Sequence, residues 1–159
     1  MNFRIGQGID FHRLEEGNDL WIGGLLIPSA KGSVAHSDGD VLIHAICDAI
    51  LGAAGLRDIG YHFPDNDPNY SKIDSKILLA KCLEMVSRAG FRIINIDSTV
   101  CLEQPRLSPY IEEMKTVLAG ITGLATDFIG VKATTTEKMG FTGREEGIVA
   151  IASVLLSKS

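Results

Sequence analysis

The sequence predicts an α/β (α+β) protein, a two-layer sandwich with helices on one face of a mixed β-sheet. Along the chain, segments with strand-like alternation of apolar and polar residues take turns with segments whose apolar residues recur at helical spacing. No linker rich in Pro and Ser, no charge block and no internal repeat divides the 159 residues, of which 45% are hydrophobic. We therefore expect one domain over residues 1–159.

The first half of the chain predicts a strand, a short strand and a long helix. Residues 4–12 (RIGQGIDFH) alternate, which is typical of a strand. Residues 21–28 predict a short strand or one arm of a hairpin, ended by a proline. The almost continuously apolar run that follows predicts a helix over 39–54, with Asp38 as its N-cap and Gly55 at its C-terminal cap.

The second half continues the alternation. Residues 56–71 are rich in Asp, Asn, Pro and Gly and predict a loop. An apolar stripe predicts a helix over 75–89, ended by Gly90. The remaining elements, assigned by the same criteria, are strands at 91–103, 127–133 and 148–156, a helix at 108–119 and a polar loop at 134–147.

Composition and charge argue against several classes of function. The net charge is −5 without a run of basic residues, whereas binding to nucleic-acid phosphates requires clustered Lys and Arg. No apolar run approaches the roughly 20 residues of a membrane span, and Met1 to Ile5 do not begin a secretory leader. Cys47, Cys82 and Cys101 are scattered, which indicates free thiols. We expect a cytoplasmic protein with neither a membrane nor a nucleic-acid partner.

A polar stripe runs through the predicted apolar helix. Asp40, His44 and Asp48 recur at every fourth residue, and buried ionisable groups must be paired, hydrogen-bonded or bound to a metal. Asp10 and His12 lie two apart on the first predicted strand, so both side chains point to the same side. With His44 they could form a three-ligand set with an open position, as in catalytic zinc sites. A surface His beside an Asp, a satisfied core network and a polar seam between subunits are the alternatives.

Two further segments offer groups that bind phosphate. His36 and Ser37 precede the predicted helix, where backbone N–H groups favour anions, although the next two aspartates oppose an anion there. Residues 132–144 combine threonine hydroxyls, lysines and an arginine, and Glu137 could bind a divalent cation. The alternative is an ordinary polar loop after a strand.

Four segments together carry a resemblance to a known family. They read GQGIDFHRL, AHSDGDVLIHAICDAILGAAGLRDIGYHFPDND, EQPRLSP and VKATTTEKMGFTGREEGI, and they cover nearly the whole chain. In this order they resemble the 2-C-methyl-D-erythritol 2,4-cyclodiphosphate synthases, enzymes of the non-mevalonate isoprenoid pathway. The resemblance implies a bacterial protein with a ferredoxin-like arrangement that assembles as a homotrimer. Its active sites would then lie between neighbouring subunits, and its sheets would face a central, largely apolar cavity.

The resemblance also implies roles for individual residues. Zinc would be bound by Asp10, His12 and His44. His36 and Thr135 would stabilise the transition state, and Glu137 would bind magnesium or manganese on the substrate's diphosphate. Substrate contacts would come from Ser37, Asp58, Gly60, Phe63, Pro64, Asp65, Asp67, Gln104, Pro105, Arg106, Leu107, Ser108, Thr134, Thr136, Phe141 and Arg144. We interpret Asp40 and Asp48 as supporting partners, beside the metal ligands or at a subunit contact.

The implied activity is a phosphorus–oxygen lyase reaction. The enzyme would convert 4-diphosphocytidyl-2-C-methyl-D-erythritol 2-phosphate to the 2,4-cyclodiphosphate and release CMP. A zinc phosphoester hydrolase and a non-enzymatic trimeric metal-binding module are the alternatives, and both would leave the 104–108 and 132–138 segments idle. The central cavity could also hold an isoprenoid diphosphate, with Arg144 near its charged end.

Overall fold

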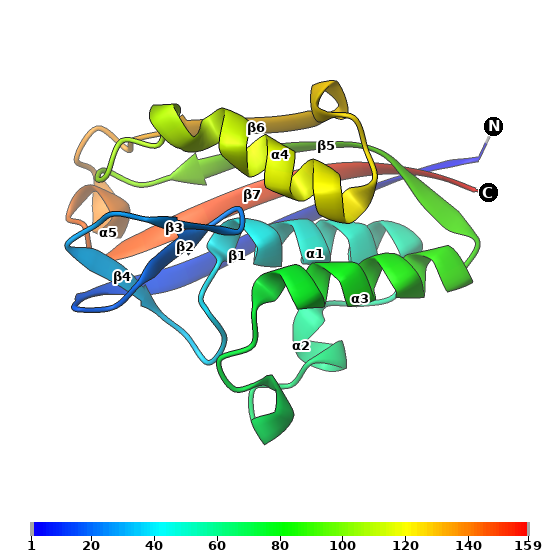
Figure 1. Ribbon diagram of the computed structural model, residues 1–159, viewed down its shortest axis with the longest axis horizontal. Helices are drawn as coiled ribbons and strands as arrows, with labels where there is room; N and C mark the ends of the chain where they lie inside the picture. The colour runs from blue at the N-terminus through cyan, green and yellow to red at the C-terminus, as the bar shows by residue number, and fades with distance from the viewer. Residues whose placement is uncertain (1, 159) are drawn as a thin grey trace.

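A five-stranded mixed sheet and the helices that cover it make up the computed structural model, which describes residues 2–158 (Figure 1). The sheet order is β4-β1-β7-β5-β6, and a separate two-stranded hairpin is formed by β2 and β3. The strands are β1 (Phe3–Glu16), β2 (Leu20–Ile22), β3 (Leu25–Ile27), β4 (Lys31–Val34), β5 (Phe91–Cys101), β6 (Ile129–Thr134) and β7 (Gly147–Lys158).

The helices follow the predicted order, with several short additions. The long helices are α1 (Val41–Ala54), α3 (Ser75–Arg88) and α4 (Ile111–Thr122). The short ones are α2 (Ile59–His62), α5 (Gly140–Gly143) and the 3₁₀ turns η1 (Pro68–Tyr70), η2 (Ser108–Tyr110) and η3 (Thr126–Phe128). No helix within residues 2–158 is long and apolar enough to cross a membrane.

Strands β1, β7 and β5 form the centre of the sheet and pair antiparallel. Strand β6 pairs parallel with β5, because the chain crosses back through α4 between them. The two-layer sandwich with a mixed sheet is therefore confirmed. The strands of the five-stranded sheet and the long helices follow one another as β1-β4-α1-α3-β5-α4-β6-β7, which differs from the β-α-β-β-α-β order of a ferredoxin-like unit. That part of the expectation was wrong, because a helix rather than a hairpin follows β5.

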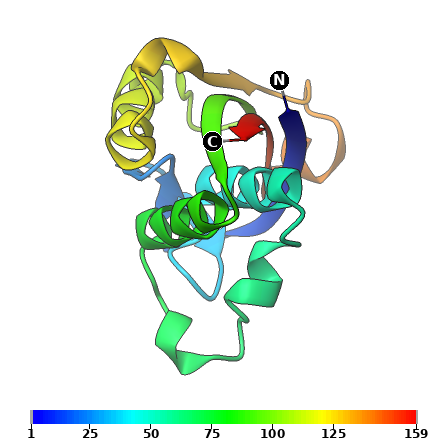
Figure 2. The ribbon, with the colours of Figure 1, turned by 90° about the vertical axis from the view of Figure 1, so that its right-hand side faces the viewer.

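Helix α1 lies at the centre of the protein, against β1 and β7 on one side and α3 on the other (Figure 2). Most of its residues are buried, which explains why its sequence is apolar on nearly every side. Gly6 and Gly8 of β1 let the strand come close to the helix. A Cβ atom at Gly8 would lie 2.0 Å from the carbonyl oxygen of Ala45, and one at Gly6 would lie 2.0 Å from that of Ala49. Because side chains alternate along a strand, the other even-numbered residues of β1 also face α1.

A Gly8→Ala variant should therefore be strongly destabilised, because backbone atoms of α1 occupy the position of the new methyl group. We expect the free energy of unfolding in urea to fall by about 3 kcal/mol. Gly120→Ala is the matched control, because a Cβ at this α4 position meets no atom within 4 Å. That variant should gain up to about 1 kcal/mol from helix propensity. A Gly8→Ala protein as stable as Gly120→Ala would contradict this account of the close approach.

The odd-numbered residues of β1 lie on the face of the sheet opposite α1. Four large apolar side chains gather there, with exposed fractions between 48% and 78%: Phe3, Ile5, Ile9 and Phe11. The long helices α1, α3 and α4 lie together on the other side (Figure 2). We call the exposed side, defined by these four β1 residues, the apolar sheet face. Gln7 stands between Ile5 and Ile9 on this face, and several large exposed apolar side chains on one face are typical of an interaction site.

Four details of the elements differ from the prediction. Asp40, not Asp38, caps α1, since its carboxylate accepts the Ile43 N–H at 3.0 Å. The expected loop at 56–71 contains α2 and η1, and the loop at 134–147 contains α5. Strand β4 was missed, because a four-residue strand leaves too little alternation to detect.

Candidate metal centre and substrate cleft

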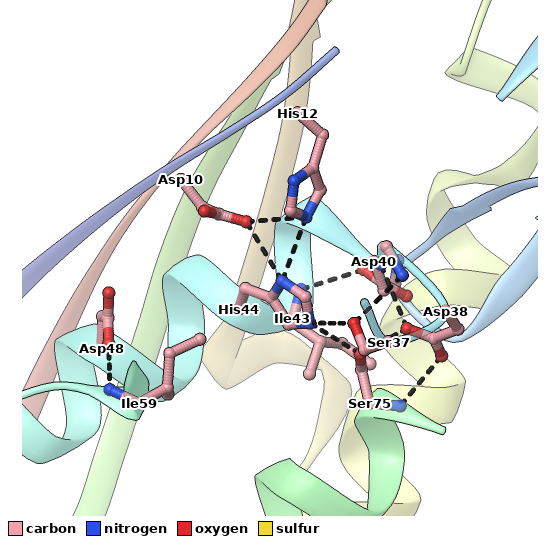
Figure 3. A network of polar contacts seen from close by, with 12 residues as sticks. Asp10, His12, Ser37, Asp38, Asp40, Ile43, His44, Asp48, Ile59 and Ser75 are labelled. Atoms are coloured by element: carbon pink, nitrogen blue, oxygen red, sulfur yellow. Dashed lines mark hydrogen bonds and ion pairs between the residues drawn. The ribbon is translucent and has the colours of Figure 1, made fainter. Parts of the chain in front are cut away.

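Strand β1 and helix α1 bring three predicted metal ligands to one point (Figure 3). Asp10 and His12 are even-numbered residues of β1 and therefore face α1, where His44 lies one turn from the N-terminus. The Asp10 Oδ2, His12 Nε2 and His44 Nδ1 atoms are each 3.1 Å from the other two. In a tetrahedral zinc site with bonds near 2.0–2.1 Å, ligand atoms lie about 3.3 Å apart. The donor types and their spacing thus fit a metal ion, and the set leaves a coordination position open.

Burial and the Asp10 carboxylate act on the two imidazoles in opposite directions. Burial lowers the pKa of His12 below its ordinary value, and the charge of Asp10 offsets only part of the effect. Burial also lowers the pKa of His44, but here the hydrogen bond and charge of Asp10 prevail, so that this pKa is raised. The same carboxylate therefore leaves the pKa of the two imidazoles shifted in opposite directions, because it makes a hydrogen bond that raises the pKa of His44 but acts on His12 by its charge alone.

The other ring nitrogen of His44 contacts two serines. Its Nε2 atom lies 2.8 Å from Ser75 Oγ and 3.2 Å from Ser37 Oγ. The Ser75 hydroxyl, at the first residue of α3, donates in turn to Asp38 Oδ1. Ser75 is fully buried. Ser75 was not predicted, because only the packing of α3 on α1 brings it beside His44.

The two other members of the polar stripe serve neighbouring backbone. Fully buried Asp40 accepts hydrogen bonds from the N–H groups of Gly23, Gly24 and Ile43. Burial raises the pKa of Asp40, and the three N–H donors oppose the rise. Half-buried Asp48 accepts the Ile59 N–H at 2.7 Å and so anchors the start of α2. Asp40 thus holds the β2–β3 turn on α1, and Asp48 holds the loop on the far side of the cleft.

The metal candidates open into a cavity of about 410 Å³. The residues predicted from sequence that line it come from β1, α1, the segment before α1 and the 58–65 loop: Asp10, His12, His36, Ser37, His44, Gly60, Phe63 and Asp65. Ile59, Tyr70 and Ile73 are among the other residues of the wall. These three were not predicted, because an apolar or aromatic residue in a loop does not by itself indicate a binding site. We call this cavity the metal cleft.

A second cavity of about 340 Å³ collects another group of predicted residues: Pro105, Arg106, Leu107, Ser108, Thr134 and Thr135. Glu103 organises its rim, since one carboxylate oxygen accepts the N–H groups of Thr136 and Lys138. Thr135 Oγ1 lies 3.5 Å from Glu137 Oε1, which leaves the exposed Glu137 carboxylate next to this cavity. We call it the threonine pocket. It shares no lining residue with the metal cleft.

The remaining candidates lie outside these two linings. Asp58 and Asp67 cap α2 and η1 beside the metal cleft, and Pro64 follows α2. Gln104 lines a neighbouring hollow with Pro105. Thr136 binds Glu103 and Thr142, and Phe141 of α5 lies with its ring centroid 6.2 Å from that of Phe11. Arg144 makes a two-bonded ion pair with Glu146, each contact at 3.0 Å.

The fold and the site define a class: two-layer α/β proteins with a carboxylate–imidazole set that could bind a metal ion in an open cleft. A family model, the YgbB family, matches residues 3–157, and the chain belongs to this family.

Similar proteins agree with this assignment. The 2-C-methyl-D-erythritol 2,4-cyclodiphosphate synthase of Bacteroides fragilis is 56% identical over 158 residues, which cover 99% of each chain. A solved cyclodiphosphate synthase in a CDP-bound form is 40% identical with a TM-score of 0.90, covering 97% of this chain and 100% of that one. The bifunctional IspDF of Campylobacter jejuni has a TM-score of 0.96 and 42% identity. This chain is covered to 99% and spans 43% of that longer protein.

Proposed function

We propose that this chain converts 4-diphosphocytidyl-2-C-methyl-D-erythritol 2-phosphate to 2-C-methyl-D-erythritol 2,4-cyclodiphosphate and releases CMP. It would thus act as a phosphorus–oxygen lyase of the non-mevalonate pathway, in the cytoplasm, as one domain over residues 1–159. The observation that carries the proposal is the three-donor cluster of Asp10, His12 and His44 inside the metal cleft of a YgbB-family chain.

The substrate contains its own nucleophile, so the protein needs none. An oxygen of the 2-phosphate attacks the β-phosphorus of the cytidine diphosphate, the bond to the α-phosphate oxygen breaks, and CMP leaves with that oxygen. The protein must fold the substrate back on itself and offset charge on phosphates that repel one another. His36 and Ser37 at the metal cleft would hold phosphate, and Thr135 would position the reacting phosphorus. No residue is required as a general base.

The chain also offers residues for two metal ions. Asp10, His12 and His44 would hold zinc, and Glu137 would contribute to a magnesium or manganese site together with the substrate's diphosphate, as expected for a cation that a single carboxylate binds. When bound, the two ions polarise the phosphates and neutralise charge that develops during transfer.

The rest of the substrate would contact the loops around the two cavities. The methylerythritol part would lie against the 58–67 loop through Asp58, Gly60, Phe63, Pro64, Asp65 and Asp67. The cytidine diphosphate would lie in the threonine pocket, against Gln104, Pro105, Arg106, Leu107, Ser108, Thr134 and Thr136. Phe141 and Arg144 would contribute from the last loop.

We further propose a homotrimer whose active sites lie between subunits. Residues that a single substrate must contact are divided between two cavities that share no lining residue. A neighbouring copy that placed its threonine pocket over the metal cleft would complete the site. The apolar sheet face, which no long helix covers, would then surround the central axis (Figure 2).

The centre of such a trimer would accept an apolar ligand. Phe11 and Phe141 lie with their ring centroids 6.2 Å apart at one end of the apolar sheet face, and Arg144 is the C-cap residue of α5, the helix that contains Phe141. We propose an isoprenoid diphosphate as the ligand, with its chain among the β1 side chains and its diphosphate at Arg144.

Phosphorus NMR of the purified protein with substrate, zinc and magnesium tests the reaction. Coupled resonances of a cyclic diphosphate, appearing together with CMP and abolished by a chelator, are the expected result. CMP with linear phosphates alone would indicate a zinc phosphoester hydrolase. Unchanged substrate with folded, zinc-loaded protein would indicate a non-enzymatic metal-binding module.

The Asp48 anchor leads to a separate prediction. In Asp48→Ala the Ile59 N–H loses its acceptor, so the loop that carries Asp58 and Gly60 becomes less ordered. We expect KM for the substrate to rise roughly tenfold with a smaller change in kcat, which corresponds to about 1.4 kcal/mol of lost substrate binding. Asp48→Asn retains an oxygen acceptor and should keep KM within about twofold. Loss of zinc from Asp48→Ala would instead place this residue among the supports of the metal centre.

A further inference from the structure

The hydrogen bonds behind His44 run in one direction (Figure 3). The Asp38 carboxylate can only accept, and the Ser75 hydroxyl donates to it. A hydroxyl has a single proton, and that of Ser75 is used in the bond to Asp38. The Ser75 Oγ atom can therefore only accept a hydrogen bond from His44 Nε2, which lies 2.8 Å away. The Nε2 atom of His44 must therefore carry a proton.

This direction matters because a neutral imidazole carries a single N–H. With the proton on Nε2, the lone pair of Nδ1 is free, and Nδ1 is the atom that lies 3.1 Å from both Asp10 Oδ2 and His12 Nε2. If Ser75 donated to Nε2 instead, the proton would lie on Nδ1 and block the metal ligand. A carboxylate at the end of such a chain also makes the ligand nitrogen more basic.

We infer that Asp38 and Ser75 are positioning residues that fix the tautomer of His44, so that its Nδ1 atom is presented to the metal ion. The inference rests on the metal centre of the proposed function and adds two residues behind it. Ser37, at 3.2 Å from Nε2, is a second acceptor, but it faces the metal cleft, and its oxygen also accepts the Gly39 N–H. Ser75 is fully buried and stays in place whatever occupies the cleft.

The pair also has a structural role, from which the effect on the metal must be separated. Asp38 Oδ2 accepts the Ser75 N–H at 2.9 Å, and the Asp38 N–H donates to the Ile73 carbonyl at 3.1 Å. Both bonds join the segment before α1 to the start of α3. Ser75→Ala keeps these two backbone contacts and removes only the hydroxyl. It is therefore a sharper variant than any change at Asp38.

The matched control is Ser98→Ala. Ser98, like Ser75, is a buried serine. Its hydroxyl donates a hydrogen bond to the Gly130 carbonyl at 2.8 Å, and it lies on β5 among residues of the sheet core. Both variants lose one buried hydroxyl. A general loss of stability would affect the two alike, whereas loss of the His44 contact affects only Ser75→Ala.

The experiment measures the zinc dissociation constant of the three proteins by competition with a chromophoric chelator. We expect Ser75→Ala to bind zinc at least about tenfold more weakly than wild type, and Ser98→Ala to stay within about twofold. Equal zinc affinity of Ser75→Ala and wild type would overturn the inference and leave the metal centre standing. Absence of zinc binding by the wild type would overturn the metal centre and the inference together.

A second measurement tests the tautomer of His44 first in the wild-type protein and then in the two variants. In the ¹⁵N NMR spectrum of zinc-loaded wild-type protein, we expect zinc on His44 Nδ1 and a slowly exchanging proton on Nε2. In Ser75→Ala this proton should exchange faster, while Ser98→Ala should match the wild type. Zinc on Nε2, or an Nε2 proton that exchanges as fast as that of an exposed histidine, would overturn the inference.

Discussion

A His44→Ala variant is expected to lose zinc and to lose cyclase activity by about a thousandfold or more, since a bound metal contributes several kcal/mol of transition-state stabilisation. His44 supplies one of three donor atoms that lie 3.1 Å apart, and its removal leaves Asp10 and His12 as a two-ligand site. Zinc content by atomic spectroscopy and product formation by phosphorus NMR measure the two losses.

The appropriate control for His44→Ala is another histidine that contacts the protein elsewhere. His62 Nε2 contacts the Leu56 carbonyl at 2.7 Å and is not one of the three clustered donors. His62→Ala should therefore keep its zinc. Circular dichroism should show that both variants are folded. A folded His44→Ala protein that retained one zinc per chain would contradict the assignment of this metal centre.

The grouping of the three candidate metal ligands could be predicted because each depends on a local pattern. Asp10 and His12 share a side by the two-residue repeat of a strand, and the apolar surroundings of His44 indicate a buried helix. Both patterns extend over a few residues, and neither depends on contacts with distant parts of the chain. The contact between β1 and α1 requires one further condition, which is the absence of a side chain at Gly6 and Gly8. The structure shows that this absence allows the strand and the helix to lie so close.

What the sequence could not provide depends on contacts between distant segments. Asp38 and Asp40 are equally good caps by residue type, and only the position of the β2–β3 turn decides that Asp40 is buried beneath it. Ser75 is an ordinary helix start until α3 packs on α1 and brings its hydroxyl to His44. The parallel pairing of β6 with β5 likewise depends on the path of α4. Local patterns predict elements, but the partners of buried polar groups follow from tertiary packing.

The apolar sheet face connects the fold to the proposed assembly. The same alternation that turns Asp10 and His12 toward α1 turns Phe3, Ile5 and Phe11 toward the opposite side. A strand with functional residues on one face and large apolar residues on the other must be covered on both. In the described chain α1 covers the first face, and the trimer that we propose would cover the second.

Ile5→Glu should therefore prevent assembly and, with it, activity. Ile5 is 78% exposed in the isolated chain and belongs to the apolar sheet face, so that in the proposed trimer three glutamates would meet in an apolar contact. A charge buried without a partner costs several kcal/mol, and three copies would repel one another. We expect a monomer by analytical ultracentrifugation and loss of cyclase activity by about a hundredfold or more, because the threonine pocket would no longer reach the metal cleft of a neighbour.

Ile77→Glu is the matched control, since Ile77 is 49% exposed on α3, away from the sheet. It should assemble and react as the wild type does. Zinc binding separates the possible causes, because Asp10, His12 and His44 belong to one chain. The Ile5→Glu monomer should therefore still bind one zinc. An active monomer would show that a single chain holds the whole active site, and would overturn the composite site while leaving the metal centre in place.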